Sequence, residues 1–597
     1  MLYHPHNPQH PAFQRKVHLL FVIFSVFMGI ILLRFVYLQV IQYERWWRLS
    51  ERNRIRNETL YPERGHIYDR NGQIIGDNRP SFDLYIIPDE CKEKCLFALQ
   101  RLSFLLGINY PFLESSYREW LKTHTPFEPF LIKKDIPYDS LIKVEVERLF
   151  IPGIYISQIP VRRYKDDFAF SHLVGHLGEI SESELKTLKG KYALGDIIGK
   201  TGIESVAENF LKGEKGWEQI EVDAFGRKVD LLNVKHPVRG SGVYLTVDMR
   251  LQEFAHSLLE GKSGTIIAMN PKNGEVLAYA VNPSFRASDF VRGIEKRKWH
   301  KYISDENAPL FNRGSFALYP PGSTIKPFFA IAALEEGLIN PNSTVNCPGF
   351  MWIGNRKFRC WKKEGHGRVS LIDAIAASCD VYFYRLALLL GKERITKYLS
   401  LFGFGKETGM VLEERKGLIP ALEKDYTAGE IANVGIGQGS ILVTPVQLLR
   451  AYAAIVNGGY LVKPRFIMRI SEKDGAELDP PLMEKLPVKD NTLEIVKKAL
   501  FEVVNGKMGT ARWLRSATLE MGGKTGTAQV VRLEKYKFYR EENLPEKYRD
   551  HALFVGFSPF NDPEIIVIAI IEHGGYGSTG AAPLVKKVIE KYYELKK

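Results

Sequence analysis

An apolar segment near the N-terminus constrains this chain more than any other feature. Apart from the titratable His18, Val17–Leu33 carries no charged side chain, and apolar residues resume after Arg34 as far as Ile41. At 1.5 Å of rise per residue, a helix over the first part reaches roughly 25 Å, and its continuation spans the ~30 Å core of a bilayer. No small-residue cleavage site of a signal peptide follows. We therefore expect an uncleaved transmembrane anchor over residues 17–41.

The charges on either side of this segment leave its orientation open. Arg15 and Lys16 precede it, while Arg45 and Arg48 follow it. Long domains cross a membrane largely regardless of nearby charge, so the bulk of the chain is free to lie outside. We expect residues 1–16 to form a short cytoplasmic tail.

Composition narrows the range of partners only a little. At 597 residues the chain has room for about three or four compact units. Its net charge of +13 suits an anionic membrane surface, an anionic polymer or nucleic acid. The basic residues are scattered and no nucleic-acid motif is present, so we expect no nucleic-acid partner.

The region that follows the anchor is mixed and carries no catalytic motif. Residues 42–62 are polar and Arg-rich, with an aromatic spacing that predicts a helix leaving the membrane. An Asn-Gly pair at residues 71–72 predicts a hairpin. Residues 89–150 have Leu and Phe at helical spacing, and residues 151–240 return to short strands and Gly turns, including 221–227.

The character of the sequence changes from Gly242 onwards. The pattern predicts a strand, a helix, two strands, a long helical stretch and further strands, over residues 243–247, 251–259, 264–269, 275–280, 323–460, 515–531 and 551–573. This order argues for an α+β domain with a helical subdomain.

One glycine-rich stretch is rejected as a nucleotide site. Gly195 and Gly199 precede Lys200 and Thr201, but three residues separate the glycines where a phosphate-binding loop has four. No strongly apolar strand precedes the stretch, so we expect a structural turn.

The first candidate for catalysis is Ser323. A Pro-Pro-Gly turn at residues 320–322 leads into it, and an apolar helical run follows. Ser at such a place commonly caps a helix. Alternatively, Ser323 and Lys326 lie one turn apart on the same face, where an uncharged Lys amine can take the Ser proton and make Oγ a nucleophile. The same Ser-x-x-Lys spacing occurs at 140–143 and 183–186, where we expect only exposed helix surface.

Two more short motifs follow in chain order. These are Ser378-Cys379-Asp380 and Lys524-Thr525-Gly526-Thr527. Acyl transfer from an amide needs a nucleophile, a base, a proton route to the leaving amine and donors for the oxyanion. Ser378 can relay a proton and Asp380 can hold Lys326.

The third motif supplies groups for substrate binding. Lys524 can offer a cation to a substrate carboxylate, and the hydroxyls of Thr525 and Thr527 can donate hydrogen bonds. Gly523 and Gly526 would keep one face of this strand clear, so that a substrate backbone can add alongside it.

Together the three motifs resemble the set found in penicillin-binding proteins and serine β-lactamases. Further stretches extend the resemblance to class B penicillin-binding proteins, and within that class to the elongation-type penicillin-binding protein 2. They lie at residues 64–72, 199–204, 312–322, 361–367 and 437–445. Asp380, where many class B members have Asn, also points to the elongation type.

The resemblance implies an overall organisation. Residues 42–240 would form an elongated, non-catalytic pedestal with a helical head near 89–150. Residues 241–597 would form a transpeptidase domain with the antiparallel sheet and helical subdomain of the serine β-lactamase-like fold. The protein would cross the bacterial cytoplasmic (inner) membrane once, with its catalytic domain periplasmic or extracellular.

The resemblance also implies a reaction. The family's acylating Ser falls on Ser323 and its base on Lys326, with backbone N–H groups of Ser323 and Thr527 as the oxyanion hole. The D-Ala-D-Ala end of one peptidoglycan stem peptide would acylate Ser323, and an amine of another stem would resolve the ester during cell-wall elongation. β-Lactams would acylate the same Ser, and no cofactor is needed for the chemistry. One departure is Gly435, where relatives often have Ser.

Partners and rival functions follow from the same resemblance. No glycosyltransferase module fits the chain, so a multi-spanning membrane glycan polymerase would supply the glycan chains. One rival is a β-lactamase or β-lactam sensor on the same fold, which the long pedestal argues against. The other is a scaffold that activates a partner, which the intact motifs argue against.

The cysteines form a second candidate site, and there are five of them, at Cys91, Cys95, Cys347, Cys360 and Cys379. The last three share one window with His366, and three thiolates with an imidazole form a usual structural zinc set. The alternatives are an isolated buried thiol at Cys379 and a Cys347–Cys360 disulfide. Some elongation-type relatives resemble this arrangement in carrying zinc, so we expect a structural zinc beside the second motif. Cys91 and Cys95 are either a local disulfide or two surface thiols.

Overall fold

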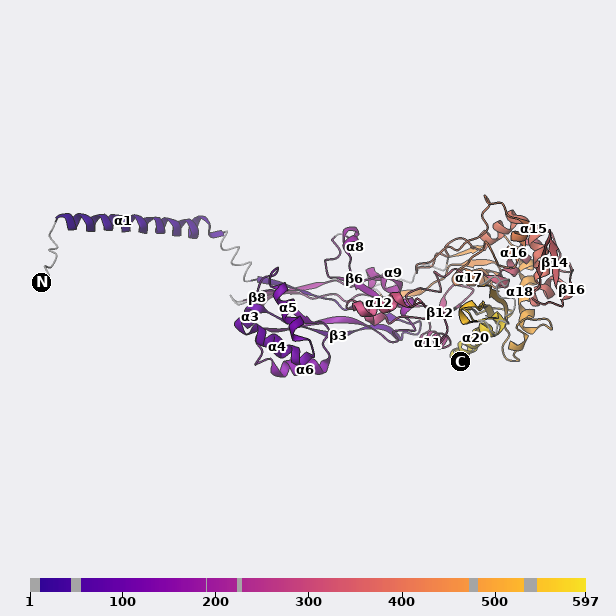
Figure 1. The fold of residues 1–597 in the computed structure, drawn as a ribbon, viewed down its shortest axis with the longest axis horizontal. Coiled ribbons are helices and arrows are strands. Elements are labelled where there is room, and N and C mark those ends of the chain that lie inside the picture. The colour runs from indigo at the N-terminus through magenta and orange to yellow at the C-terminus, as the bar shows by residue number, and fades with distance from the viewer. Residues whose placement is uncertain (1–10, 45–54, 189, 223–227, 472–481, 531–544) are drawn as a thin grey trace. The chain divides into compact units, whose positions relative to one another are not determined.

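The computed structural model describes residues 11–44, 55–188, 190–222, 228–471, 482–530 and 545–597, and it divides into two compact units (Figure 1). Unit 1 comprises residues 1–62, 81–159 and 214–238, and unit 2 comprises residues 63–80, 160–213 and 239–597. Each unit therefore collects segments that are distant in sequence.

The predicted anchor is helical. Helix α1 spans Pro11–Val36 and continues as a π-helical turn over Tyr37–Ile41. Of the described residues, only this helix is long and apolar enough to cross a membrane. Its side chains are almost all exposed, as expected for a segment whose natural solvent is lipid. It fits a single-pass membrane anchor.

The helix predicted over residues 42–62 is wrong for its last part. Strand β1 (Ile55–Leu60) lies there and pairs antiparallel with β8 (Gly216–Val222), which pairs with β9 (Lys228–Lys235). Residues 45–54 and part of the predicted turn at 221–227 lie outside the described residues. The strand partner is more than 150 residues away in sequence, so local periodicity did not reveal it.

The predicted helical head is present in unit 1. Its elements are α3 (Pro88–Cys91), α4 (Cys95–Leu106), α5 (Tyr110–Trp120), β4 (Phe130–Lys133) and α6 (Tyr138–Glu147). They share one apolar core, which includes Leu99, Leu102 and Val144, all fully buried. The Asn109 side chain accepts a hydrogen bond from Phe112 N and caps α5, which explains why the helical pattern stops and restarts there.

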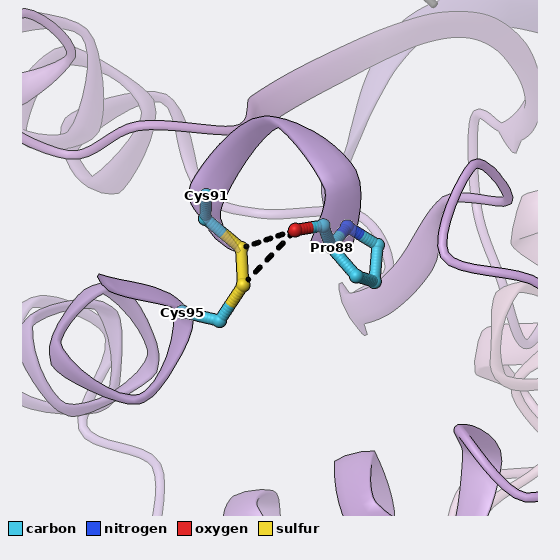
Figure 2. Close-up of a disulfide and its surroundings, with 3 residues drawn as sticks. All are labelled: Pro88, Cys91 and Cys95. Carbon is cyan, nitrogen blue, oxygen red and sulfur yellow. Dashed lines mark hydrogen bonds between the residues drawn. A yellow bond between two sulfur atoms is a disulfide. The ribbon is translucent and has the colours of Figure 1, made fainter. Parts of the chain in front are cut away.

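Cys91 and Cys95 form a disulfide between α3 and α4 (Figure 2). Both sulfur atoms approach the Pro88 carbonyl oxygen, Cys91 at 3.4 Å and Cys95 at 3.3 Å. The local-disulfide alternative is therefore the one that the structure adopts, and it ties the start of the head to its longest helix.

The predicted hairpin at Asn71-Gly72 is confirmed. Strand β2 (Ile67–Tyr68) pairs antiparallel with the start of β3 (Ile74–Ile86), which ends in unit 1. The Asp69 carboxylate closes the turn by accepting hydrogen bonds from the Asn71 and Gln73 N–H groups, both at 2.8 Å.

The rest of the non-catalytic part of unit 2 consists of short elements. They are the end of β5 (Ile154–Tyr164), α7 (Ser171–Val174), β6 (Leu177–Glu179), α8 (Glu182–Thr187), β7 (Ile197–Gly199), α9 (Gly202–Val206) and α10 (Glu208–Leu211). Glu204, fully buried, binds Arg162 at 2.6 Å and Arg64 at 2.8 Å. Burial alone would raise the pKa of Glu204, but the two guanidinium groups outweigh it and lower that pKa. This ion cluster joins the 64–72 and 199–204 stretches.

The stretch rejected as a phosphate loop is indeed a structural turn. Lys200 pairs with Glu184 at 2.5 Å, and a Cβ on Gly199 would lie 2.0 Å from the Glu204 carbonyl oxygen. Its glycine therefore serves close backbone packing.

Unit 2 is built on a five-stranded antiparallel sheet. Its order is β12-β11-β22-β21-β20, with β11 at Gly264–Met269, β12 at Val276–Asn282, β20 at Gly522–Ala528, β21 at His551–Ser558 and β22 at Ile565–Ile571. The central strands are buried almost throughout, as in a sheet covered on both faces. Two mutually contacting helices, α11 (Met249–Ser257) and α20 (Ala582–Lys596), pack on it, as do α17 (Pro445–Val456) and α18 (Asp490–Asn505).

Smaller strands complete the unit, namely β10 (Gly242–Leu245), β17 (Tyr460–Val462), β18 (Ile467–Ser471) and β19 (Met483–Lys485). Short helices α12 (Lys296–Ser304) and α19 (Gly577–Gly580) also belong to it. The predicted α+β class is confirmed.

A helical region is inserted between β12 and β20. It contains α13 (Lys326–Glu335), α14 (Leu371–Ala376), α15 (Asp380–Leu401) and α16 (Ala428–Gly435), with α15 interrupted at Gly391. Two antiparallel strand pairs lie in it, β13 (Val345–Cys347) with β16 (Gly367–Val369) and, in the segment between them, the hairpin of β14 (Phe350–Ile353) with β15 (Arg356–Arg359). A Cβ on Gly435 would lie 2.6 Å from the Cβ of Ala387, so the glycine at this position allows close packing of α16 on α15.

Candidate active site

Ser323 lies in a short 3₁₀ turn, Gly322–Ile325, that leads directly into α13. Its side chain caps neither element, so the capping interpretation is wrong. Residues three apart in a 3₁₀ turn stack on one face, which places Lys326 behind Ser323. Ser323 is half-buried, whereas Lys326 is fully buried.

The Lys326 amine is held by the second motif. Its Nζ donates to Asp380 Oδ1 at 2.7 Å, to the Ser378 carbonyl oxygen at 2.9 Å and to Ser378 Oγ at 3.2 Å. Burial raises the pKa of the Asp380 carboxyl, and the Lys326 charge opposes that rise. The amine is therefore fixed within reach of the hydroxyl that would relay a proton.

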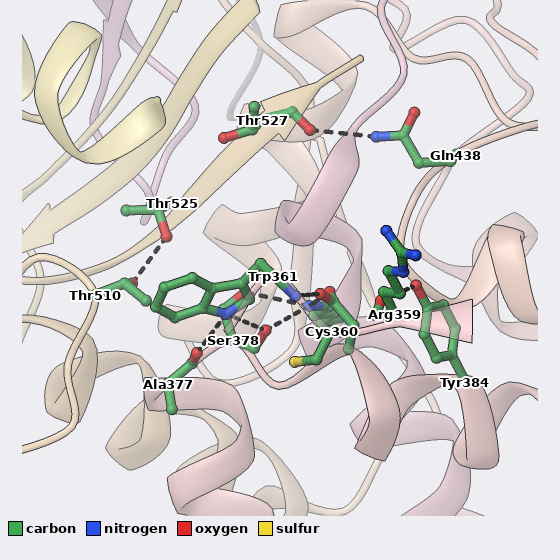
Figure 3. Close-up of polar contacts among 12 residues, drawn as sticks. Arg359, Cys360, Trp361, Ala377, Ser378, Tyr384, Gln438, Thr510, Thr525 and Thr527 are labelled. Atoms are coloured by element: carbon green, nitrogen blue, oxygen red, sulfur yellow. Dashed lines mark hydrogen bonds and ion pairs between the residues drawn. The ribbon is translucent and has the colours of Figure 1, made fainter. Parts of the chain in front are cut away.

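Trp361 braces the second motif from a separate loop. Its indole N–H lies 3.1 Å from the carbonyl oxygens of both Ala377 and Ser378, and its backbone N–H donates to Asp380 Oδ2 at 2.8 Å (Figure 3). Sequence reasoning used Trp361 only as a mark of the elongation type. Its bracing role is visible only once the 361–367 loop is folded against α14 and α15.

The third motif lies on β20, the edge strand of the sheet. Lys524 is fully buried and donates to the Thr525 carbonyl oxygen at 3.1 Å. Burial, and then the nearby positive charge of Lys326, lower the pKa of Lys524 well below its usual value. A free strand edge is where an extended substrate can add.

The reason proposed above for the glycines of β20 is wrong. A Cβ on Gly523 would lie 2.4 Å from the Val555 carbonyl oxygen, and one on Gly526 would lie 2.8 Å from Thr324 Cγ2. These glycines therefore allow β20 to pack against β21 and the Ser323 turn, rather than clearing a face for substrate.

Two residues that sequence reasoning missed hold the threonines of the third motif. Thr510 Oγ1 lies 2.8 Å from Thr525 Oγ1, while its backbone N–H donates to the Ala376 carbonyl oxygen at 3.1 Å. Gln438 Nε2 donates to the Thr527 carbonyl oxygen at 3.2 Å (Figure 3). The Gly-Gln-Gly triplet around Gln438 was the only feature of the sequence that pointed to either of these two residues.

The four predicted metal ligands do come together. The ligand atoms of Cys347, Cys360, His366 and Cys379 all lie within 4.8 Å of one another. His366 Nδ1 is 3.7 Å from Cys347 Sγ and 3.5 Å from Cys360 Sγ. The three thiols are free, so the Cys347–Cys360 disulfide is not formed. The cluster can hold a metal ion.

The other Ser-x-x-Lys pairs lie apart from this site. The pair at 140–143 is on α6 and the pair at 183–186 is on α8, with both lysines exposed as expected. Of the three matches, only that of Ser323 meets the second and third motifs.

Comparisons with known proteins agree with this geometry. Residues 264–590 match the family described as penicillin binding protein transpeptidase domain, and residues 59–245 match the penicillin-binding protein dimerisation domain. The chain is similar to the peptidoglycan D,D-transpeptidase MrdA of Haemophilus influenzae, at 33% identity over 97% of this chain and 92% of that protein.

Solved structures give the same result. The penicillin-binding protein PBP2 of Helicobacter pylori, in complex with MreC, is similar with a TM-score of 0.78 and 31% identity, over 91% of this chain and 99% of that chain. A chain of a peptidoglycan synthase complex that coordinates polymerization and crosslinking is similar with a TM-score of 0.72 and 28% identity, over 98% and 99%. The chain therefore belongs to the penicillin-binding protein 2 family of peptidoglycan D,D-transpeptidases, which are serine acyl-transfer enzymes.

Proposed function

We propose that Ser323 is the acylated nucleophile and Lys326 its base. The observation that carries this assignment is the buried amine of Lys326, the residue that directly follows the Ser323 turn, held at 2.7 Å by Asp380 and at 3.2 Å by Ser378 Oγ. Lys326 would accept the Ser323 proton, and Ser378 would relay a proton to the leaving amine. Asp380 keeps the amine in place.

The reaction proceeds in two acyl transfers. Ser323 Oγ attacks the carbonyl carbon of the D-Ala-D-Ala amide bond and forms an ester. The terminal D-Ala leaves with its amine nitrogen protonated. An amine of a second stem peptide then attacks the ester, forming the cross-link and returning the proton to Ser323. A β-lactam would acylate the same oxygen.

The oxyanion would be bound by the N–H groups of Ser323 and Thr527. A Cβ on Gly322 would lie 2.5 Å from the Thr527 carbonyl oxygen, so the Ser323 turn and β20 are in direct backbone contact. Two backbone donors converging on one carbonyl oxygen typically contribute about 2.7–4 kcal/mol each. Thr525, Gly526 and Thr527 would align the substrate strand, and Lys524 would donate to the substrate carboxylate, whose negative charge would favour the protonated form of this buried amine.

Fluorescent-penicillin labelling of the full chain in detergent tests the assignment. Wild type should label stoichiometrically and slowly release the label, whereas Ser323→Ala should not label. Ser183→Ala, in another Ser-x-x-Lys pair, is the matched control and should label as wild type does. Equal labelling of wild type and Ser323→Ala would refute the nucleophile, and rapid turnover of penicillin would favour a β-lactamase.

We also propose that the Cys347, Cys360, His366 and Cys379 cluster holds a structural zinc ion. Zinc bound tetrahedrally by thiolates and an imidazole requires ligand atoms about 3.5–3.8 Å apart. The His366 distances of 3.7 and 3.5 Å fit that requirement, while the four ligand atoms as a set lie within 4.8 Å of one another, so an ion would draw the more widely spaced ones together. His366 Nε2 is buried without a hydrogen-bond partner in the described residues.

Metal analysis of freshly purified protein tests the zinc. About one zinc per chain is expected in wild type and in the control Cys91→Ser, and none in Cys360→Ser. A wild-type protein without zinc would refute the proposal.

The cellular setting is also a proposal. We infer that the domains of residues 42–240 and 241–597 lie outside the cytoplasmic membrane behind the 1–16 tail, in the periplasm or the extracellular space, and the Cys91–Cys95 disulfide supports an oxidising exterior. Since a similar chain works in a synthase complex that couples polymerization to crosslinking, we propose a membrane glycan polymerase as partner. Co-purification of such a polymerase with the full chain tests this.

A further inference from the structure

Helix α12 (Lys296–Ser304), which the mechanism does not use, combines positive charge with exposed aromatic surface. Its first three residues, Lys296, Arg297 and Lys298, are all cationic, and the one acidic residue at this end is the N-cap Glu295. Positive charge at a helix N-terminus opposes the helix dipole and costs about 0.3–1 kcal/mol per charge. Three successive cations in a first helical turn, where positive charge is unfavourable, are a reason to look for a function.

One face of α12 is fixed to unit 2. Lys298 pairs with Asp289 at 2.8 Å, and the Tyr302 hydroxyl donates to the same carboxylate at 3.0 Å. The Tyr302 ring also stacks on Phe290, with 5.9 Å between ring centroids. Lys298 and Tyr302 are four residues apart, so they share the face that points to the protein.

The rest of the helix surface is left to solvent. Lys296, Arg297 and Lys301 are exposed there and have no carboxylate partner among the residues that the structure describes. Trp299, 42% exposed, and Ile303, 53% exposed, adjoin Lys296, whereas Arg297 and Lys301 lie on the other side of this exposed surface. The exposed indole beside Lys296 provides a flat stacking surface, and the two further cations add positive charge.

We propose that this face of α12 binds the peptidoglycan polymer outside the active site. Stem peptides carry free carboxylates, so the polymer on which this family acts is a polyanionic glycopeptide that complements the three cations. The face of a sugar ring suits stacking on the Trp299 indole. The site would hold the polymer near the enzyme while stem peptides enter the active site, raising their effective concentration.

Two other occupants fit the surface less well. An amphipathic helix that lies on a membrane needs a large apolar face, whereas this helix exposes only Trp299 and Ile303 on its free side. A stable protein partner would need about 800 Å² on each side, far more than a nine-residue helix provides.

Co-sedimentation of the full chain in detergent with purified sacculi tests the proposal. The variant Lys296→Glu/Arg297→Glu/Lys301→Glu should bind about tenfold more weakly, because three surface charge contacts are reversed. The matched control Lys406→Glu/Lys498→Glu/Lys587→Glu changes net charge equally at three exposed, scattered positions and should bind as wild type does. Sacculi whose carboxylates have been amidated should bind wild type as weakly as they bind the α12 variant.

Further measurements keep the result interpretable. Trp299→Ala should weaken binding without any change in charge, and all variants should keep wild-type unfolding temperatures and penicillin labelling. The proposal would be overturned if the α12 variant and the scattered control lost sacculus binding equally, or if neither lost it. Retained sacculus binding with lost binding to anionic phosphatidylglycerol vesicles would assign the face to a membrane instead. Because labelling reports Ser323 separately, failure here is distinguishable from failure of the acyl-enzyme assignment.

Discussion

Ser378 adopts a left-handed backbone conformation, with φ at +53°, that non-glycine residues rarely occupy. Such a conformation costs of order 1 kcal/mol or more, so surrounding contacts must maintain it. Lys326 Nζ and the Trp361 indole both donate to its carbonyl oxygen. The hydroxyl that we propose as proton relay is therefore carried by a strained backbone that two donors hold in place.

Replacement of Trp361 by Phe tests this. The ring would still contact His366, but the indole donor would be lost, and one lost hydrogen bond of about 1.4 kcal/mol predicts roughly tenfold slower acylation. The measurement is the second-order rate of fluorescent-penicillin labelling. Trp352→Phe, an equally exposed Trp on β14, is the control and should label normally. Normal labelling of Trp361→Phe would refute the bracing role.

Gln438 contacts the third motif, on the other side of the site. It donates to the Thr527 carbonyl oxygen, while the preceding Gly437 carbonyl accepts from Gly322 N–H at 3.0 Å. The loop thereby binds the peptide groups adjacent to the two that would supply the oxyanion hole. Gln438→Glu keeps the shape but replaces a donor by a carboxylate, which should slow the acylation step about tenfold or more.

The kinetic split distinguishes positioning from a loss of structure. The acylation rate constant should fall while the dissociation constant of the initial penicillin complex and the unfolding temperature stay unchanged. Gln219→Glu in unit 1 controls for the added charge. A weaker initial complex with an unchanged acylation step would contradict the positioning role.

At the scale of elements, the sequence predicted those whose pattern is local. The sheet strands β11, β12, β21 and β22 were found from sequence pattern, the anchor α1 from its uncharged apolar length, and the 71–72 hairpin from turn chemistry. Strand β1 was mistaken for helix, because its partner β8 is distant in the chain. For the same reason the contacts of Trp361, Thr510 and Gln438 were not predictable, since each joins loops that meet only after folding.

The cysteine cluster links elements that would otherwise be joined only by a loop. Cys347 ends β13, Cys360 follows β15, and Cys379 immediately precedes α15. Since Cys379 lies between Ser378 and Asp380, a bound ion would fix the second motif to both hairpins.

Metal removal should therefore affect both stability and acylation. Treatment with a chelator should lower the unfolding temperature by a few degrees and slow penicillin labelling, because ligand binding to the native state stabilises it. Readdition of zinc should restore both properties. The Cys360→Ser variant should show the lowered values and no response to the chelator; unchanged values in chelated wild type would contradict the structural role.

On the scale of the whole molecule, buried histidines should make stability depend on pH. His172 lies in α7 and His176 follows just after this helix, and both rings pack against Phe285. Burial lowers the pKa of each to about 4, from an ordinary value of 6.5. In the unfolded chain both would titrate near 6.5.

The sign follows from proton linkage. Above pH 6.5 neither state takes up these protons, so the stability that neutral burial contributes is fully present. As the pH falls from 6.5 towards 4, the unfolded chain binds two protons that the native state does not bind. Over this range each histidine lowers the free energy of unfolding by about 3 kcal/mol. Below pH 4 the loss from these two groups levels off.

Thermal unfolding of the full chain between pH 7.5 and 4.5 measures this dependence. The unfolding temperature of wild type should fall throughout the lower part of the range. Burial lowers the pKa of a third described histidine, His551, to about 4 as well, so His172→Phe should flatten the decline by about a third, whereas exposed His236→Gln should leave it unchanged. A histidine that stays neutral in the native state must, by proton linkage, contribute to the fall of the unfolding temperature with pH. If the curves of unfolding temperature against pH ran parallel for wild type and His172→Phe, the pH dependence would arise from other groups.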